Sequence, residues 1–469
     1  MSDLVNIDSG KIISELIIRL DRLEQRVVEL ERENVFLKKE NDELRGRIAK
    51  YGSPKNSRNS SIPPSKDENR PRKNQSLRKV TGRKPGGQPG HKGNTLKMTA
   101  DPDLVVELRP DYCRNCGSSL SGAGSAVEKT RQTVDIPPIR AVWTEYRAYG
   151  AQCACGCRTV ADFPGVAGSP VSYGNNIEGL IAYFHARQYL PFKRMKEMMG
   201  DVMGIDISEG GIHYLLARFA DRAAPIYETI RQRIAASTVV GADETGIKVD
   251  GNRHWFWAWQ NERLTYIAHS DTRGKAAVDA HFPDGFPMAT LVRDGWRPQT
   301  GTVAKHHQTC LAHLSRDLNY LIEKYGDDTW ASDCRELLFN AIELGKNGRG
   351  EKYDTERAGI IQRLQKILER PPDADHKELR TFYKRMCKER PNLFNFLYLP
   401  EVPPDNNGSE RAIRNVKVKQ KISGQFKKTG AAQNFAKIRS VIDTTIKNGM
   451  NVVDALSLIA KLQPQVRTD

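Results

Sequence analysis

Three acidic side chains stand where a carboxylate could bind a metal ion. Asp243 follows a short valine-containing apolar run, Asp294 closes a second apolar run, and Glu410 stands where a Pro-rich loop gives way to an expected helix. The first run predicts a buried strand ending at Asp243, followed by a turn at Thr245-Gly246 into a neighbouring strand. Three carboxylates from separate elements could hold two Mg²⁺ ions, which prefer oxygen ligands and promote reactions at phosphorus. An acid after a strand is also a common turn former, so the spacing alone leaves both interpretations open.

A second set of chemically active residues is a cluster of cysteines. Cys113 and Cys116 form one pair, and Cys153, Cys155 and Cys157 follow within the same short region. Clustered thiols of this kind are typical of a metal site, whereas a disulfide framework is typical of secreted proteins. We predict one structural Zn²⁺ ion held by four thiolates. Because the second group is irregular, Cys153 and Cys155 are assigned as its ligands with Cys157 as the alternative, and free thiols are the competing interpretation.

The residues after Glu410 are strongly basic, with no acid before Asp443. A solvated helix face normally mixes both signs, so a one-sided run beside a candidate metal site favours contacts with a phosphate backbone. The predicted DNA-backbone contacts are Arg411, Arg414, Lys417, Lys419, Lys421, Lys427 and Lys428.

The overall composition agrees with a polyanionic partner. The 469 residues carry a formal net charge of +16 and a pI near 9.4, which favours nucleic acid or an anionic membrane surface. No apolar run approaches the roughly 18 residues of a membrane span, and the first residues lack the core of a signal peptide. We therefore expect no membrane partner.

Residues 10–51 carry a heptad pattern that predicts a leucine-zipper coiled coil. Leucine fills every d position and asparagine stands at two a positions, which favours a parallel two-stranded dimer in one register. The side chains expected at the interface are Leu16, Leu23, Leu30, Asn34, Leu37, Asn41 and Leu44. A single amphipathic helix packed on its own protein is the alternative. The basic stretch that follows has almost no apolar side chains, which predicts a disordered linker that could also track a phosphate backbone.

The remaining chain must supply the elements that position the acids. Trp255, Trp257 and Trp259 share one face of an expected strand and are assigned to the core, with stacking on bases as the alternative. Cys310 and His313 have ligand-like spacing, but two residues do not complete a metal site, so they are assigned a structural role.

The predicted domains are the coiled coil (10–51), the basic linker (52–100), a zinc-ribbon DNA-binding module (101–168), a helix-turn-helix-like helical domain (170–235), the first part of the catalytic core (236–316), a helical insertion (317–402), a core helix with the third acid and the basic segment (403–446), and a C-terminal helix and tail (447–469).

Several motifs occur in the order seen in a known family. They are NSSIPPSKD (59–67), GRKPGGQPGH (82–91), the two cysteine groups, ADET (242–245), CLAH (310–313) and NGSER (407–411). With these motifs the chain resembles the IS66-family transposases of bacterial insertion sequences. The resemblance implies a multidomain α/β protein with a ribonuclease H-like core, in which a mixed sheet with flanking helices carries a helical insertion. It also implies that Asp243, Asp294 and Glu410 form a DDE triad that binds two Mg²⁺ or Mn²⁺ ions.

The family resemblance also implies a function and partners. The protein is expected in the bacterial cytoplasm, associated with the nucleoid, where it cuts DNA at the ends of a mobile element and joins the resulting 3′-hydroxyl to target DNA. Its expected partners are double-stranded DNA, further copies of itself in a homodimer or higher oligomer, and accessory proteins of the same element. Two alternatives stay open: a non-catalytic zinc and helix-turn-helix regulator, and a nuclease of the same fold without strand transfer.

Overall fold

The computed structural model describes residues 9–52, 90, 92–93, 96–164, 169–325, 329–347 and 350–462. Most of the predicted linker, the motifs at 59–67 and most of 82–91, the side chain of Leu16 and the tail from 463 lie outside this described part. The chain divides into two compact units. One comprises the described residues of Met1–Arg70, Glu145–Met198 and Asp206–Asp469, and the other those of Pro71–Thr144 and Met199–Ile205.

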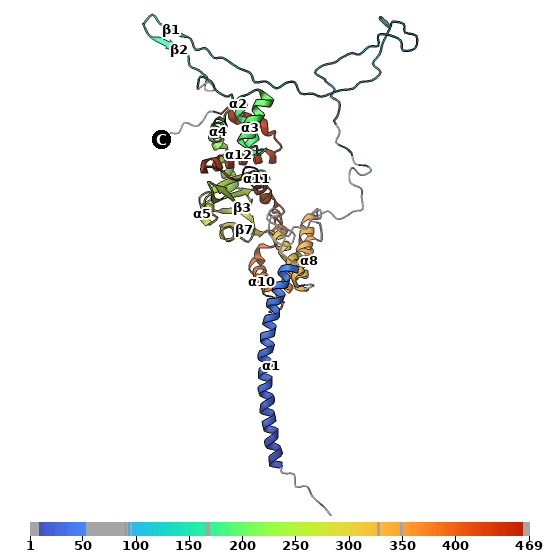
Figure 1. Ribbon diagram of the computed structural model, residues 1–469, viewed down its shortest axis with the longest axis vertical. Helices are drawn as coiled ribbons and strands as arrows, with labels where there is room; N and C mark the ends of the chain where they lie inside the picture. The colour runs from blue at the N-terminus through green and yellow to red at the C-terminus, as the bar shows by residue number, and fades with distance from the viewer. Residues whose placement is uncertain are drawn as a thin grey trace, which may run out of the picture. The chain divides into compact units, whose positions relative to one another are not determined.

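The N-terminal segment forms one long helix, α1 (Ser9–Gly52), drawn in blue in Figure 1. Its side chains are described from residue 18 to 45, and all of them are exposed. They include the leucines of the predicted interface, Leu23, Leu30, Leu37 and Leu44. The predicted helix is therefore confirmed, while its pairing into a coiled coil stays a prediction.

A five-stranded mixed sheet lies in the first unit, with the strand order β5-β4-β3-β6-β7. β3, β4 and β5 are antiparallel neighbours, whereas β6 runs parallel to β3 and β7 runs parallel to β6. The mixed sheet and its flanking helices confirm the predicted α/β class. The strands are β3 (Val239–Val249), β4 (Asn252–Gln260), β5 (Thr265–Ser270), β6 (Phe286–Arg293) and β7 (Ala304–Thr309).

The central strand β3 differs from the expected one. It runs through eleven residues without a turn, and Asp243 lies near its middle. The predicted turn at Thr245-Gly246 is wrong, because both residues pair with β4 and the backbone stays extended there. The chain turns at Asp250 and Gly251, whose φ angles of 48° and 74° are left-handed, as a two-residue hairpin of this type requires.

Helices pack on the sheet and on one another in the first unit. α11 (Asn407–Ser423) packs on β3 and β4, and α12 (Thr429–Lys447) packs on β5 and on α4 (Glu209–Ala235). The hydroxyl of Ser208 caps α4 by accepting from the backbone N–H of Gly211. None of the described helices combines the length and the apolar character that a membrane span requires. The other described helices are α2 (Asn175–Ala186), α3 (Phe192–Met203), α5 (Lys275–Asp279), α6 (Arg297–Thr300) and α13 (Val452–Ala460), and β1 (Gly150–Gln152) and β2 (Arg158–Val160) form a separate antiparallel hairpin.

Between β7 and α11 the chain builds a helical group with its own buried core. Leu337, Phe382 and Leu397 belong to one cluster of buried side chains in this group. The helix that carries the third acid, α11, therefore follows this helical group in the chain. The group consists of α7 (Leu311–Tyr325), α8 (Thr329–Lys346), α9 (Tyr353–Leu368), α10 (Lys377–Glu389) and the 3-10 turns η2 (Arg390–Asn392) and η3 (Asn395–Leu397).

The tryptophans of β4 mostly belong to the core. Trp257 and Trp259 are fully buried, and their rings stack with 5.7 Å between centroids. Trp255 is only partly buried, and the guanidinium of Arg253 lies 5.4 Å from its ring centroid. The assignment of this strand face to the core is confirmed for Trp257 and Trp259.

Candidate active site

The three predicted acids lie on three elements that meet at the sheet. Asp243 lies within β3, Asp294 directly follows β6, and Glu410 lies in the first turn of α11. β3 and β6 pair in parallel up to Gly241 and Val292. Asp243 and Asp294 each lie two residues beyond this last pair, so both acids leave the paired part of the two neighbouring strands at the same end. Because α11 packs on β3, Glu410 approaches the same strand.

The electrostatics of Asp243 shows that these carboxylates share one neighbourhood. Burial raises the pKa of Asp243 well above its usual value, and the charges of Glu244, Asp294 and Glu410 raise it further. In the described part of the chain, neither Asp243 nor Asp294 forms an ion pair with a cationic side chain. A divalent cation would offset this negative charge, so the acids fit Mg²⁺ by charge and by ligand type.

The three acids do not, however, approach one another closely enough to share one ion in this arrangement. Among the described residues, three ligand-type side chains gather within 4.8 Å of one another only at Cys310, His313 and Glu410. The carboxylate of Glu410 accepts a hydrogen bond of 3.1 Å from Arg316. Burial and the charge of Arg316 lower the pKa of His313, and the charges of Glu410 and Asp294 partly offset this effect. His313 therefore lies near both acids.

Cys310, His313 and Arg316 lie beside Glu410, and the sequence did not predict that they meet it. The ligand-like spacing of Cys310 and His313 is the one signal that the sequence offers, and their structural role stays a prediction. Their third neighbour, Glu410, lies far along the chain, beyond the helical group, so no local pattern could reveal it.

Asn406 fastens the start of α11 to the rest of the core. Its side-chain amide donates to the backbone oxygen of Ala242 at 2.6 Å, and its backbone N–H donates to the sulfur of Cys310 at 3.2 Å. Its side-chain oxygen accepts a hydrogen bond of 2.6 Å from the hydroxyl of Ser409. A Cβ atom at Gly241 would lie 2.6 Å from the Ser409 hydroxyl, so the close approach of α11 to β3 requires glycine there. Asn406 therefore sets the distance between the helix that carries Glu410 and the strand that carries Asp243.

Glu244 lies on the opposite face of β3 from Asp243, as side chains alternate along a strand. Its carboxylate is buried, pairs with Arg273 at 2.7 Å and accepts a hydrogen bond from Gln299. This set of contacts ties β3 to the segments after β5 and β6. Glu244 is therefore a structural acid next to the candidate site.

The predicted phosphate contacts separate into exposed and buried side chains. Arg411, Arg414, Lys421, Lys427 and Lys428 are exposed, and Lys417 is partly buried with its ammonium donating to the Gly246 oxygen. Lys419 requires a correction. Its side chain is only 4% exposed and its ammonium lies 3.4 Å from Nδ1 of the buried His185, so it is not available to a phosphate. Its place on the buried face of α11 follows from helical periodicity, since Val416 and Lys419 are three residues apart.

The cysteine groups form two tight loops. In the first, Cys113 donates its N–H to Ser118 and accepts from Gly117, and hydrogen bonding to Ser118 lowers the pKa of Cys116 to about 7. In the second, the N–H of Cys153 donates to the Cys157 oxygen. Backbone hydrogen bonding at Cys157 lowers the pKa of Cys155.

All five thiols of these loops are free. The loops belong to different units of the chain. The zinc site that would join them therefore stays a prediction.

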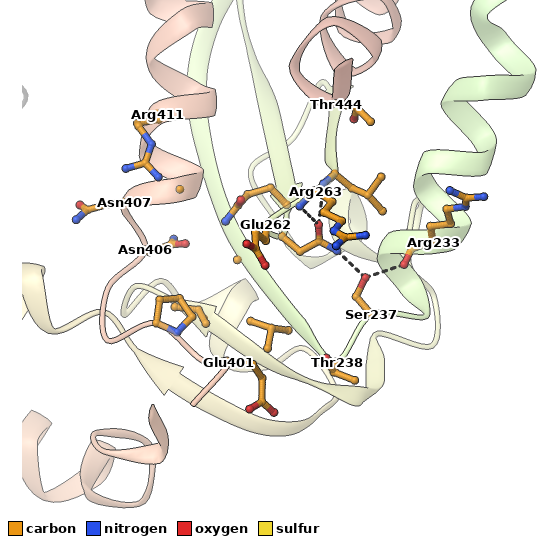
Figure 2. Close-up of a pocket in the computed structure, with 18 of the residues that line it drawn as sticks. Arg233, Ser237, Thr238, Glu262, Arg263, Glu401, Asn406, Asn407, Arg411 and Thr444 are labelled. Carbon is orange, nitrogen blue, oxygen red and sulfur yellow. Dashed lines mark hydrogen bonds between the residues drawn. The ribbon is translucent and has the colours of Figure 1, made fainter. Parts of the chain in front are cut away.

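A cavity of about 1030 Å³ with a mixed polar and apolar lining adjoins the start of α11. Figure 2 shows Asn406, Asn407 and Arg411 on one side of it and Arg233 and Ser237 on another. Amides, hydroxyls and guanidinium groups of this kind can hydrogen-bond phosphate and base edges. The cavity shares Gly241 and Asn406 with the segments that position the acids.

Two family models match the chain. The model described as "Transposase IS66 family" matches residues 170–434, which is more than half of the chain and includes the sheet, the three acids and the helical group. A model described as a family of unknown function, DUF6444, matches residues 12–97. No curated protein is significantly similar to the chain.

Proposed function

Because the chain belongs to the IS66 family of transposases, we propose that it binds the ends of its mobile element, cuts them and joins them to target DNA. In this proposal Asp243, Asp294 and Glu410 are the metal-binding triad. A transposase acts on DNA, and the net charge of +16 suits that partner.

The observation that carries the proposal is the uncompensated charge at Asp243. Asp243 lies on the central strand and is partly buried. Burial raises the pKa of its carboxyl well above the usual value, and the charges of Glu244, Asp294 and Glu410 raise it further. When bound, two Mg²⁺ or Mn²⁺ ions would lower the pKa of a nucleophile and stabilise the charge that develops at phosphorus. Asp243, Asp294 and Glu410 would hold them. Because the Glu410 carboxylate accepts a hydrogen bond from Arg316 in this arrangement, Glu410 must give up that contact to bind a metal ion.

The architecture supports a ribonuclease H-like core. Three antiparallel strands are followed by two parallel ones on the other side of β3, with acids on the central strand, after its parallel neighbour and on a helix beyond an insertion. This is the order in which the DDE resemblance places its acids. The exposed basic side chains of α11 and the following loop, including Arg414 and Lys421, would bind the DNA backbone without reading its sequence.

Three further features complete the proposal. We propose that Cys113, Cys116, Cys153 and Cys155, with Cys157 as the alternative, hold one Zn²⁺ ion in a DNA-binding module, because their loops carry free thiols with lowered pKa values at Cys116 and Cys155. Metal analysis of the purified protein tests this, and a protein free of zinc would contradict it. The coiled-coil dimer of α1 and the DNA contact of the helices before β3 are proposed on the heptad and helix-turn-helix patterns.

The central test is metal-dependent cleavage of DNA that carries the element's own end. We expect Asp243→Asn and Glu410→Gln to bind this DNA but to lose cleavage, whereas the surface variant Asp279→Asn should cut like the wild type, because its ion pair with Lys275 is exposed. Cleavage at wild-type rates by either site variant would show that the triad is wrongly assigned, whereas a wild-type protein that binds this DNA without any metal-dependent cleavage would belong to the regulator class. Cleavage without joining to target DNA would assign it to the nucleases.

A further inference from the structure

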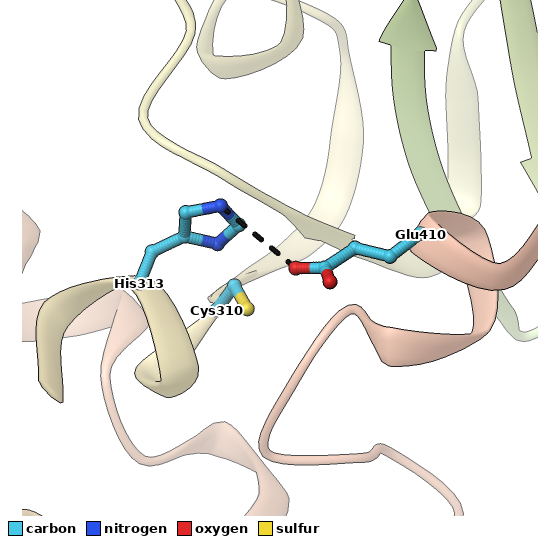
Figure 3. A group of neighbouring side chains, drawn as sticks. All are labelled: Cys310, His313 and Glu410. Carbon is cyan, nitrogen blue, oxygen red and sulfur yellow. Dashed lines mark ion pairs between the residues drawn. The ribbon is translucent and has the colours of Figure 1, made fainter. Parts of the chain in front are cut away.

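A cluster of three different ligand types lies beside the proposed triad and is not explained by it. The candidate ligand atoms of Cys310, His313 and Glu410 lie within 4.8 Å of one another. Figure 3 shows the imidazole of His313 and the sulfur of Cys310 next to the carboxylate of Glu410. One nitrogen of His313, Nε2, is 3.8 Å from that carboxylate, which is too far for a hydrogen bond.

That separation suits a shared metal ion. Bonds of about 2.0–2.1 Å from zinc to a histidine nitrogen and a carboxylate oxygen, at a tetrahedral angle, place the two ligand atoms roughly 3.4 Å apart. The observed distance therefore needs only a small movement. The imidazole also lacks other hydrogen-bond commitments: its Nδ1 is buried and has no hydrogen-bond partner among the described residues.

The sulfur of Cys310 is held in place by backbone N–H groups. Cys310 directly precedes α7, and the backbone N–H of Asn406 donates to its sulfur at 3.2 Å. Burial raises the pKa of the Cys310 thiol to about 11 against the opposing effect of backbone hydrogen bonds from Asn406, His313 and Ala312, so an incoming ion must displace the thiol proton to gain a thiolate ligand. The same helix turn presents His313, so two of the three ligands come from one rigid element.

We propose that Cys310, His313 and Glu410 form a binding site for a thiophilic divalent cation of the Zn²⁺ class. Sulfur and imidazole ligands select Zn²⁺ and disfavour Mg²⁺, which demands oxygen ligands. Three protein ligands leave a fourth position open to water, as in exchangeable zinc sites. Arg316 must release Glu410 for the ion to bind, so the site holds Zn²⁺ less tightly than a closed structural site does.

The consequence for activity rests on the proposed function. Glu410 cannot serve both this ion and the Mg²⁺ ions of the triad, so Zn²⁺ in this site inhibits DNA cleavage in competition with Mg²⁺. The inhibition should therefore weaken as the Mg²⁺ concentration is raised.

The test compares wild-type protein with Cys310→Ser, because the serine hydroxyl can accept the Asn406 N–H in place of the sulfur while the soft ligand is removed. After dialysis against zinc, the variant should retain one zinc ion fewer per chain than the wild type. Titration with Co²⁺ should give a weaker sulfur-to-metal absorption band. Where DNA cleavage is measured, half-inhibition of each protein's own Mg²⁺-dependent rate should need at least about tenfold more Zn²⁺ in the variant, since even the loss of an outer partner of a metal ligand costs ~10–100-fold in affinity.

Cys387→Ser is the matched control, because Cys387 is exposed on α10 and outside the cluster. It should behave as the wild type in all three measurements. His313→Gln is a second variant that removes a different ligand and should also lose one zinc ion. Equal zinc content and equal Zn²⁺ inhibition in wild type, Cys310→Ser and His313→Gln would overturn the proposal. Should no variant or wild-type protein cut DNA, the proposed function fails while the zinc count and the Co²⁺ spectrum still decide this site.

Discussion

Asp243 places a carboxylate where the fold supplies no cation from the described residues. Burial is the largest cause of its raised pKa, followed by the charges of Glu244, Asp294 and Glu410. A carboxyl whose folded-state pKa is raised costs stability in its ionised form. This cost is absent below the unfolded pKa of about 3.9 and grows as the pH rises from there to the folded-state pKa. The ionised carboxylate that metal binding needs at this residue therefore lowers the stability of the metal-free fold.

The first prediction is that removing the charge of Asp243 stabilises the metal-free protein. Without metal at pH 7, Asp243→Asn should raise the free energy of unfolding, because it removes the cost of ionising a carboxyl whose folded-state pKa is raised, and the gain should shrink towards pH 4. Urea unfolding followed by tryptophan fluorescence measures it, because Trp257 and Trp259 are buried in the same sheet. Asp279→Asn is the control and should change little. A variant less stable than the wild type at pH 7 would contradict the assignment of an unneutralised charge.

A second prediction separates two lysines of α11 that have the same chemistry. Lys421 is exposed, so Lys421→Ala should weaken DNA binding and reduce the slope of log affinity against log salt by about 0.9. Lys419 is buried, and burial lowers its pKa to about 8, so Lys419→Met should leave that slope unchanged. Salt titrations of DNA binding measure both. A reduced slope for Lys419→Met would show that the buried lysine reaches DNA.

Lys419 also makes a pH-dependent stability prediction. A lysine whose folded-state pKa is lowered costs stability while it is protonated, fully below about pH 8 and less as the pH rises towards its unfolded value of about 10.4. Lys419→Met should therefore be more stable than the wild type at pH 7, with a gain that declines towards pH 10. Lys421→Ala should show no such dependence.

At the scale of elements, contacts at the start of α11 fix the position of Glu410 relative to Asp243. Asn406 is buried and bonds to Ala242 of β3 and to Cys310 before α7. Asn406→Ala leaves the Ala242 oxygen without its partner, which costs about 1–3 kcal/mol for a buried group. We expect this loss of stability together with a lower cleavage rate that higher Mg²⁺ partly restores, because a misplaced Glu410 weakens metal binding. Asp279→Asn, in an exposed ion pair with Lys275, should keep both properties. A purely structural role for Asn406 would lower stability without changing the Mg²⁺ dependence.

How far the sequence predicts these elements depends on the range of the contacts involved. The mixed α/β class, the long α1 helix and the buried Trp257 and Trp259 follow from local periodicity. The turn expected at Thr245-Gly246 fails because pairing with β4 keeps that segment extended. The meeting of Cys310 and His313 with Glu410 depends on packing across the helical group, and no local pattern encodes it.

At the scale of the whole molecule, the chain joins a DNA-processing core to an N-terminal helix with an exposed leucine stripe. α1 is 44 residues long, and Leu23, Leu30 and Leu37 are each about half exposed or more. Burying such a stripe against a second copy removes apolar surface from water. A mobile element has two ends, so a dimer would also bring one active site to each end.

The last prediction concerns this assembly. The full chain should sediment as a dimer, about twice its mass of 52.8 kDa. Asparagine at an a position fixes register and dimeric state at a cost in stability. Asn34→Leu should therefore tighten self-association while admitting species larger than the dimer, as measured by analytical ultracentrifugation. Gln25→Leu, on the outer face of the heptad pattern, is the matched control and should stay dimeric. A wild-type chain that remains monomeric at tens of micromolar would rule out the zipper. The leucine stripe of α1 would then have to pack on another surface of the same chain.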